Sequence, residues 1–448
     1  MNIRAISVFA ASMFAAAVGA VERTYVGTDG MWSTAANWSP SGVPEAGDTA
    51  TIPAGELVEV TGADVATAAA CGEIVIESGA KLSFTNITAN ATLAGKISGA
   101  GKFSAVNAKG TKKRLTFTGD LSGFTGGMDF RYVHATFTTA HSGSSTIKFV
   151  ESNDDQMRET FSGGFTYNNP LDVSVGANYG LEVASGTTVA GAIELRSGRI
   201  RGPGTVSGEL RVYGTCYVEN KVVIEGDVKK AGSGTCYFES DGGTTYLKAP
   251  VDAGISVCVI GMSGKFILYG ENLFADSTVL NIGKAWSASH KSGTYDLNGY
   301  SQRAMRLALV DSANMQPANT VITSAEKATL TLLNQSADVN YKGQLTGAVS
   351  LDLASASAKT FTLNGTDNDT TGSLIVRSGT LALGTSAKFL NLSGLVVTNT
   401  GTLSVSTENV NPNVELNIFG SGVVNVSADV TLQVAHATLD SGGVKSHL

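Results

Sequence analysis

The sequence predicts an all-β fold, and within that class a parallel β-helix with an N-terminal cap. Three observations indicate this fold: short alternating segments that end in Ser-Gly, paired glycines inside apolar segments, and a Gly-Thr-Cys-Tyr motif that occurs at 214–217 and again at 234–237. Proline is scarce, at 8 of 448 residues. A low proline content suits a chain whose backbone N–H groups serve in β-ladders, because proline cannot donate a hydrogen bond.

Residues 1–20 have the features of a secretory signal peptide. Arg4 supplies a positive charge, residues 5–18 are apolar, and Val18-Gly19-Ala20 places suitable residues before a cleavage site. The apolar stretch is short for a membrane span, and no later segment reaches the length that a span needs. We therefore expect export, with no transmembrane segment after cleavage, in preference to the alternative of a buried N-terminal helix.

Residues 21–60 lack the repeat pattern and are predicted to form the N-terminal cap. The end of a β-helix exposes unpaired strand edges, which need a cover. Trp32 and Trp38 lie in this segment and are expected to fill it; a surface site for an aromatic ligand is the alternative. Residues 61–440 are predicted to form the β-helix and residues 441–448 a polar tail.

The apolar-x-apolar-x-Ser-Gly segments predict short strands that end at a bend. Alternation places the apolar side chains on one face of each strand, and glycine tolerates the positive φ that a bend requires. We expect the four bends to occupy equivalent corners of the coil: Ser78-Gly79, Ser185-Gly186, Ser197-Gly198 and Ser378-Gly379. Residues 303–310 are ambiguous, but a strand is favoured over a helical turn there.

The Gly-Thr-Cys-Tyr motif gives the length of one coil. Its two copies contain Cys216 and Cys236, and the offset between them is too short for a propeller blade of about 40 residues. Stacked coils would bring these cysteines to about 4.8 Å between Cα atoms. That separation allows either a disulfide or a ladder of buried thiols, and Cys258 is a weaker candidate for the next coil.

The charge of the chain argues against nucleic acid as a partner. The formal net charge is −7 and the isoelectric point is about 5.4. Nucleic-acid binding requires clustered Lys and Arg that displace counterions from phosphates.

No catalytic, cofactor-binding or metal-binding residues are assigned from the sequence. The five histidines lack the spacing of metal ligands: His134, His141, His290, His436 and His447. Three further groups of polar residues are candidate sites, and each is interpreted as structural. They are Asp154, Asp155 and Arg158 as a solvated loop, Asp367, Asn368 and Asp369 as Asx turns, and Arg196, Arg199, Arg201 and Arg211 as a solvated basic stripe. The alternatives are a lyase-type calcium and base site, a calcium loop, and a site for an anionic glycan, respectively.

Several motifs resemble those of a known family. The segment Trp32-Ser33-Thr34-Ala35-Ala36-Asn37-Trp38-Ser39, followed by Gly42-Val43-Pro44 and Gly47-Asp48-Thr49-Ala50, resembles the opening of large bacterial surface proteins that carry the autotransporter-associated β-strand repeat. Residues 95–126 and 343–383 resemble the repeat itself. In both blocks a second glycine follows a strand-ending glycine by seven positions, as in Gly119 and Gly126, and in Gly365 and Gly372.

The resemblance covers about a third of the chain and has departures. The first block departs after Gly127, and the second lacks one glycine of the Gly-x-Gly pair. It implies a single-stranded, right-handed parallel β-helix of the pectin-lyase-like kind in an exported passenger or surface protein. It implies no catalytic residues.

These observations predict a non-enzymatic, exported β-helical protein that serves as a cell-surface or extracellular scaffold and resembles an adhesin. An extracellular glycan or a cell-surface polymer is the partner expected for such a protein. The alternative is a β-helical polysaccharide lyase or glycoside hydrolase. That function would require a lateral groove with converging carboxylates and a base.

Overall fold

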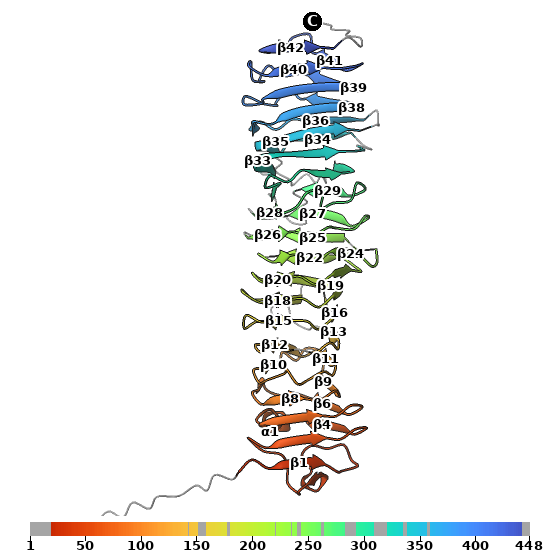
Figure 1. Ribbon diagram of the computed structural model, residues 1–448, viewed down its shortest axis with the longest axis vertical. Helices are drawn as coiled ribbons and strands as arrows, with labels where there is room; N and C mark the ends of the chain where they lie inside the picture. Colours follow the sequence, from red (N-terminus) through yellow and green to blue (C-terminus); the bar gives the residue numbers. More distant parts are fainter. Residues whose placement is uncertain are drawn as a thin grey trace, which may run out of the picture.

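The computed structural model describes residues 19–440 except 142, 151–157, 177–179, 220, 234, 240–242, 261–263, 283–292, 309–319, 335–337 and 356–358. The described chain is an elongated stack of β-strands with about 15 turns and 2% helix (Figure 1). At about 4.8 Å per turn, the stack is about 70 Å long. The prediction of a nearly helix-free parallel β-helix is confirmed. The predicted signal peptide up to Val18 and the predicted tail at 441–448 lie outside the described residues.

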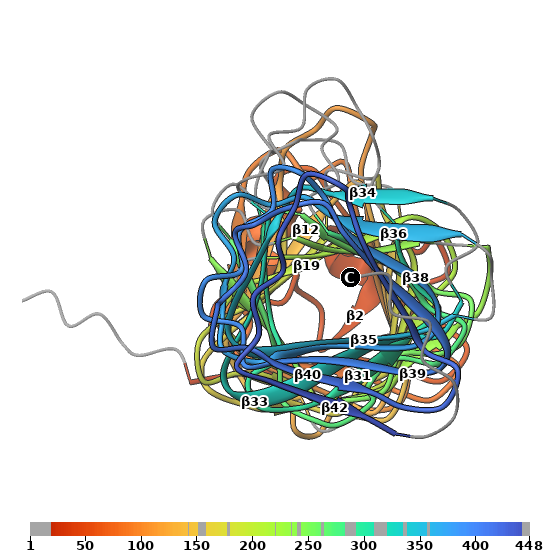
Figure 2. The same cartoon turned by 90° about the horizontal axis from the view of Figure 1, so that it is seen from above.

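A full coil carries three strands, one on each of three faces that surround a common interior (Figure 2). The chain passes from the first face to the second and then to the third. The first face holds β3 (Thr49–Ile52), β5 (Glu73–Ile76), β8 (Lys96–Ser98), β15 (Thr166–Tyr167), β18 (Thr188–Val189), β20 (Thr205–Val206), β23 (Val223–Ile224), β26 (Thr244–Leu247), β28 (Lys265–Leu268), β30 (Gly293–Asp296), the starts of β33 (Thr320–Leu332) and β35 (Gln344–Ala354), and β37 (Asp369–Thr370).

The second face continues directly after the first. It holds β4 (Leu57–Thr61), β6 (Lys81–Thr85), β9 (Lys102–Val106), β11 (Met128–Arg131), β13 (Ile147–Val150), β16 (Leu171–Ser174), the start of β19 (Ile193–Arg201), β21 (Leu210–Val212), β24 (Val228–Lys230), β31 (Gln302–Ala304), the ends of β33 and β35, the starts of β38 (Ser373–Leu383) and β39 (Gly394–Val405), β40 (Glu415–Ile418) and β42 (His436–Leu439).

The third face closes each coil. It holds β7 (Ala91–Leu93), β10 (Arg114–Phe117), β12 (His134–Phe137), β14 (Glu159–Phe161), β17 (Gly180–Val183), the end of β19, β22 (Cys216–Glu219), β25 (Thr235–Glu239), β27 (Ser256–Ile260), β29 (Val279–Ile282), β32 (Arg306–Ala308), β34 (Val339–Tyr341), β36 (Thr360–Leu363), the ends of β38 and β39, and β41 (Val423–Val426). The strand preference for residues 303–310 is confirmed at 303–304 and 306–308, with a bend at Met305 between β31 and β32. Residues 309 and 310 lie outside the described residues.

The register between coils is parallel, and the length of a coil varies. Ile193 pairs with Leu210, 17 positions later, whereas Val58 pairs with Leu82, 24 positions later. The strands keep their inward and outward alternation, so the extra residues are accommodated in the bends. A repeat of variable length is the reason that no single period describes the whole sequence.

The interior is a continuous column of apolar side chains. In its N-terminal half the column is aromatic, with ring centroids 4.9 Å apart for Phe117 and Phe137 and 5.2 Å apart for Phe137 and Phe161. These rings are fully buried. Each coil has no core of its own, so stacking is what removes these side chains from water, and each fully buried side chain contributes about 1.5–3 kcal/mol.

The prediction that the four Ser-Gly bends occupy equivalent corners is wrong. Their glycines share a positive φ of 73 to 110°, but Ser78-Gly79 joins the first face to the second and Ser185-Gly186 joins the third to the first. The other two bends, at Ser197-Gly198 and Ser378-Gly379, lie between the second and third faces. All three corners need a sharp turn, so the same dipeptide serves at each of them.

A second set of glycines is required by close packing between coils. Each repeat-like block has two such glycines. Gly119 and Gly365 lie where the chain passes from the third face to the first, and Gly126 and Gly372 lie where it passes from the first face to the second. A Cβ at any of these positions would overlap a carbonyl oxygen of the previous coil, far inside the 3.0 Å that real Cβ atoms keep, as at Gly119, Gly126, Gly365 and Gly372. The two blocks therefore occupy the same part of the coil.

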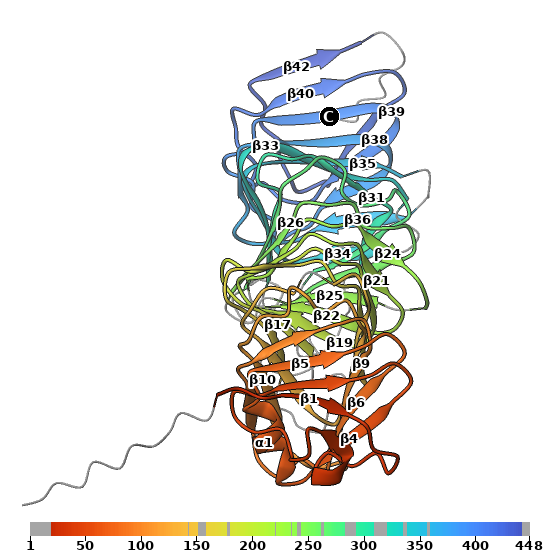
Figure 3. The ribbon, with the colours of Figure 1, turned by 60° about the horizontal axis from the view of Figure 1, so that its bottom comes forward.

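The N-terminal end of the rod is closed by a compact cap. Strand β1 (Glu22–Tyr25) pairs in parallel with β3 and antiparallel with β2 (Trp38–Ser39). The 3-10 turn η1 (Ala35–Asn37) precedes β2. Helix α1 (Asp64–Ala69) takes the third face of the first coil, and Figure 3 shows it at this end of the rod. Strand β3 and all of β4 but its last residue, Thr61, fall within residues 21–60, yet both strands already belong to the coils.

The two cap tryptophans form its core. Trp32 and Trp38 are at most 2% exposed, with their ring centroids 4.8 Å apart. The Nε1–H of Trp38 donates to the carbonyl oxygen of Trp32 at 2.8 Å. The alternative of a surface site for an aromatic ligand is therefore wrong. At the other end of the described chain, β42 pairs with β40, and all four of its residues are exposed.

Candidate functional site

Many outward-facing charges on the described coils pair with opposite charges on neighbouring coils. Arg377 Nε lies 2.8 Å from Asp352 Oδ2, and Lys248 Nζ lies 2.8 Å from Glu225 Oε1. These pairs join residues one coil apart, as the parallel register requires. Other inter-coil pairs are Lys96–Glu73, Lys102–Asp129, Arg158–Glu182, Lys265–Asp296 and Arg303–Asp276.

The predicted basic stripe is divided between two faces. Arg196 and Arg211 lie on the second face, and Arg199 and Arg201 lie on the third, on either side of the Ser197-Gly198 corner. Each has a carboxylate partner: Asp172 for Arg196, Glu194 and Glu209 for Arg211, and Glu219 for both Arg199 and Arg201. The positive charge is thereby neutralised, which disfavours a site for an anionic glycan.

The third-face part of this stripe is an ordered cluster. Glu219 is 3% exposed and accepts from Arg199, while Arg201 Nη2 lies 3.4 Å from Glu219 Oε2. The guanidinium of Arg199 lies 4.4 Å from the ring centroid of Tyr217, which stacks on Tyr237 at 5.0 Å. Because Arg199 and Tyr237 both pack against the Tyr217 ring, it is a poor platform for stacking a sugar.

The described histidines do not form a metal site. His134 and His141 are each 1% exposed; His134 Nδ1 lies 3.4 Å from Glu159 Oε1, and His141 bonds to Asn169. Burial lowers the pKa of His141, although its hydrogen bond to Asn169 opposes this. His436 is exposed on β42. Among the described residues, no three side chains of His, Cys, Asp or Glu converge to hold a metal ion; His290 and His447 lie outside them.

The described residues of the two acidic groups, at 154–158 and 367–369, do not converge to form a site. Arg158 pairs with Glu182 at 3.0 Å, while Asp154 and Asp155 lie outside the described residues. Asn368 is 6% exposed, donates to the carbonyl oxygen of Gly365 and accepts from the N–H of Leu345. This segment is therefore a bend tied to the previous coil, and these hydrogen bonds of Asn368 are not those of the Asx turn that the sequence predicts, in which the side-chain oxygen accepts from the backbone N–H two residues on. The carboxylate of Asp367 accepts from Thr366, and that of Asp369 accepts from Asn391.

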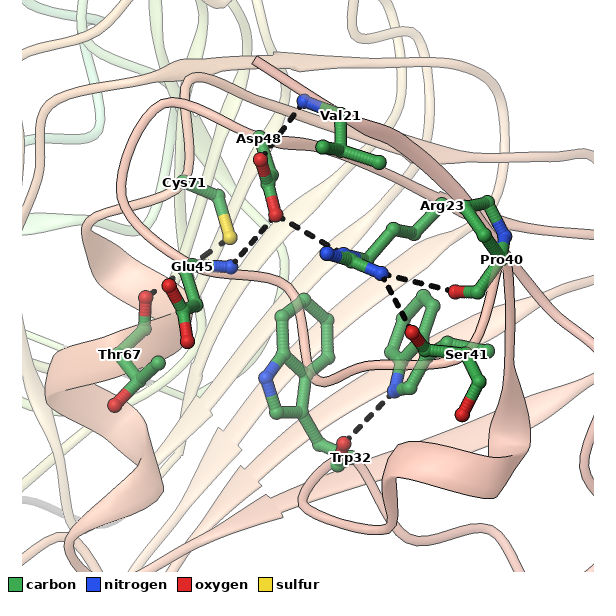
Figure 4. A network of polar contacts seen from close by, with 10 residues as sticks. Val21, Arg23, Trp32, Pro40, Ser41, Glu45, Asp48, Thr67 and Cys71 are labelled. Atoms are coloured by element: carbon green, nitrogen blue, oxygen red, sulfur yellow. Dashed lines mark hydrogen bonds and ion pairs between the residues drawn. The ribbon is translucent and has the colours of Figure 1, made fainter. Parts of the chain in front are cut away.

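The buried carboxylate of Asp48 has several hydrogen-bond partners, and the sequence does not mark it as a site. Asp48, 6% exposed, immediately precedes β3, the first strand of the first coil (Figure 4). Its Oδ1 accepts from the Val21 nitrogen at 2.9 Å, and its Oδ2 accepts from Arg23 Nε and from the Glu45 N–H, both at 3.1 Å. Burial alone raises the pKa of Asp48, but these donors outweigh it and lower the pKa.

Arg23 extends this network to the cap loop. Its Nη1 donates to the carbonyl oxygens of Pro40 and Ser41 at 2.9 and 3.1 Å. The network therefore holds β1 and the loop after β2 against the first coil. The segment Gly47-Asp48-Thr49 belongs to a motif that resembles the family. Val21 and Arg23 lie more than 20 positions earlier in the chain, so the local sequence around Asp48 does not reveal them as its partners.

Asp48 is expected to give the cap a pH-dependent stability. Because its folded-state pKa is lowered, its contribution is complete above the unfolded value of about 4 and is lost as the pH falls through the folded value. Asp48→Asn should lower the free energy of unfolding by about 2 kcal/mol at about pH 6 and by less at about pH 3. Fluorescence of Trp32 and Trp38, measured with the third tryptophan replaced (Trp286→Phe), would report the transition. An equal loss at both pH values would contradict this role.

The predicted stacking of Cys216 on Cys236 is confirmed by the strand register, and both are thiols. Cys258 pairs with Tyr237 and is out of register with the ladder. The Sγ of Cys216 donates to the carbonyl oxygen of Leu195, and burial raises the pKa of Cys216 to about 12. The ladder of buried thiols, rather than the disulfide, is the arrangement in this structure.

We expect neither thiol of the ladder to react in the folded protein. At about pH 8 nearly all of Cys216 is protonated, and the thiolate is the reactive form. Iodoacetamide labelling followed by peptide mapping should find both cysteines modified only after unfolding in urea. A Cys216–Cys236 disulfide peptide in the unreduced map would be the contrary result.

One narrow hollow borders α1. It is lined by Ala68, Cys71, Ile74 and Leu93 among others. It is too small to hold a water molecule. Its polar lining residues are Lys96, whose Nζ pairs with Glu73 at 2.9 Å, and Cys71, whose thiol pKa burial raises to about 12.

Comparisons with known proteins give no assignment. No family model matches the chain, and neither the curated proteins nor the solved structures gave a match. None of the helices in the described chain has the length and hydrophobicity needed to cross a membrane.

Proposed function

We propose that this chain is an exported, non-enzymatic scaffold that acts at the cell surface or in the extracellular space. The observation that carries the proposal is the pairing of outward charges between successive coils. An enzyme built on the side of a β-helix needs carboxylates and a base that converge on one point. Here the paired charges run along the rod, where they favour stacking of the coils.

Two further features support export and surface display. Residues 1–20 have the charge, apolar stretch and cleavage-site residues of a signal peptide. The opening segment and the two internal blocks resemble exported bacterial surface proteins with β-helical passengers. A long, narrow rod would hold a binding partner, such as a glycan or another cell-surface polymer, away from the membrane.

Removal of one whole coil tests the scaffold role. Leu374 pairs with Leu395, so deletion of residues 374–394 joins equivalent positions of neighbouring coils. We expect this variant to fold, to be about 4.8 Å shorter by small-angle scattering, and to remain accessible to protease on intact cells. Deletion of residues 374–384 is the control, since it removes half a coil and should unfold the C-terminal coils.

Two results would contradict the proposal. One is that the full-length chain stays inaccessible to protease on intact cells and absent from the medium. The other is the release of shortened or unsaturated sugars from an acidic polysaccharide by the purified protein, which would favour the lyase or hydrolase alternative.

A further inference from the structure

The backbone nitrogen of Val21 is bound by a buried carboxylate. It donates to Asp48 Oδ1 at 2.9 Å, while the Val21 carbonyl oxygen accepts from the Thr49 N–H at 3.0 Å. Figure 4 shows Val21, which immediately precedes β1, and Arg23 of β1 approaching Asp48. The two preceding residues, Gly19 and Ala20, are exposed. Among the described residues, the first with hydrogen bonds to the first coil is thus the residue that follows the predicted cleavage site.

We infer that removal of residues 1–20 places the new α-ammonium group of Val21 on the buried Asp48 carboxylate, so that processing locks the N-terminal cap. This inference rests on the proposed export through a signal peptide. It adds a binding site, Asp48, for a group that exists only in the processed chain.

The chemistry of cleavage explains the change in the Val21 nitrogen. A signal peptidase hydrolyses the Ala20–Val21 amide: the C–N bond breaks, the oxygen of water goes to the Ala20 carbonyl carbon, and both protons of the water end on the nitrogen. At neutral pH the products are a carboxylate on Ala20 and an ammonium on Val21. A neutral amide with one N–H becomes a cation with three, and charge-assisted hydrogen bonds are about twice as strong as neutral ones.

The surroundings of Asp48 suit this role. Arg23 Nε and the Glu45 N–H occupy Oδ2, which leaves Oδ1 to Val21. Other ionisable groups nearby are Glu22 on β1, Glu45 in the preceding loop, Glu73 on β5, whose N–H donates to the Asp48 carbonyl oxygen at 3.1 Å, and Cys71, whose pKa rises through burial and, secondarily, the Asp48 charge. Gly19 and Ala20, on the other side of the Ala20–Val21 bond, are exposed.

The ionisation of the α-amine gives the direct test. One chain is released from a cleavable fusion so that it begins at Val21, and the matched chain begins at Ala20, whose amine would lie in solvent. Both contain all the secondary structure elements that the structure describes. The rate of acylation of each N-terminus, followed across pH by peptide mass spectrometry, gives the pKa of the amine.

We expect the amine of the Val21 chain to titrate at least one pH unit above the usual value of about 7.7–8.0, and that of the Ala20 chain to titrate normally. At about pH 7 this shift corresponds to roughly tenfold less of the reactive neutral amine. Asp48→Asn in the Val21 chain should return the pKa to the usual range. Equal pKa values in the Val21 and Ala20 chains would overturn the inference, even if the Asn variant failed to fold.

Processing in cells is tested separately. A protein recovered from the medium or the cell surface that begins at Val21 supports the inference. An exported protein that begins at another residue overturns it and leaves the proposed export intact. Retention of the whole precursor inside the cell contradicts the proposed function itself.

Discussion

Gly126→Ala is expected to lower the free energy of unfolding by about 3 kcal/mol, whereas Gly127→Ala should change it by less than about 1 kcal/mol. A Cβ on Gly126 would overlap the Gly101 carbonyl oxygen of the previous coil, and backbone cannot move aside without breaking the ladder. A Cβ on Gly127 would lie 3.5 Å from its nearest neighbour, the Thr146 carbonyl oxygen, which is ordinary contact.

The two glycines make a matched pair because they are adjacent and neither has a positive φ. Both lose the same conformational entropy in the unfolded chain when replaced by alanine. The difference between the variants in urea unfolding, followed by circular dichroism, therefore reports the clash between coils. Equal stability of the two variants would mean that the coils are not stacked as closely as the structure has them.

Phe137→Ala is expected to lower the free energy of unfolding by about 3–5 kcal/mol, because the substitution leaves a cavity in the aromatic column. The Phe137 ring is fully buried and lies between Phe117 and Phe161, at centroid distances of 4.9 and 5.2 Å. Few neighbours can move to fill the space, since stacked coils fix the rings above and below. Urea unfolding of the purified variant measures the loss.

Phe165→Ala is the control for this substitution. Phe165 is 39% exposed and lies between β14 and β15, so its replacement should cost less than about 1 kcal/mol. If Phe137→Ala were no more destabilising than Phe165→Ala, the continuous aromatic column would not be a main source of stability in this half of the rod.

The class of fold is visible in the sequence because its causes are local. Alternation of apolar and polar residues is read within a strand, and a Ser-Gly bend is read within a dipeptide. The Cys216 and Cys236 motifs gave the coil length correctly at one point, because the strands and bends between them make up one complete coil. The cap tryptophans were also predicted from their position in a segment without the repeat.

Only the tertiary structure decided which residues of neighbouring coils lie in contact. The coil is short where Ile193 pairs with Leu210 and longer where Val58 pairs with Leu82, and each bend shifts the register of all that follows. For this reason the sequence predicted a bend at Ser185-Gly186 but not its corner, and a basic stripe at Arg196 to Arg211 but not its division between two faces.

The sequence by itself thus determined the strands, the bends, the direction of the side chains and the expectation of export. The tertiary structure decided that Asp48 accepts hydrogen bonds from Val21 and Arg23 and that Glu219 pairs with two arginines. It also decided that Gly126 must lack a side chain. The physical reason is that all of these contacts join residues of different coils or of the cap and the first coil. Their partners are set by the summed lengths of bends, which local sequence patterns do not encode.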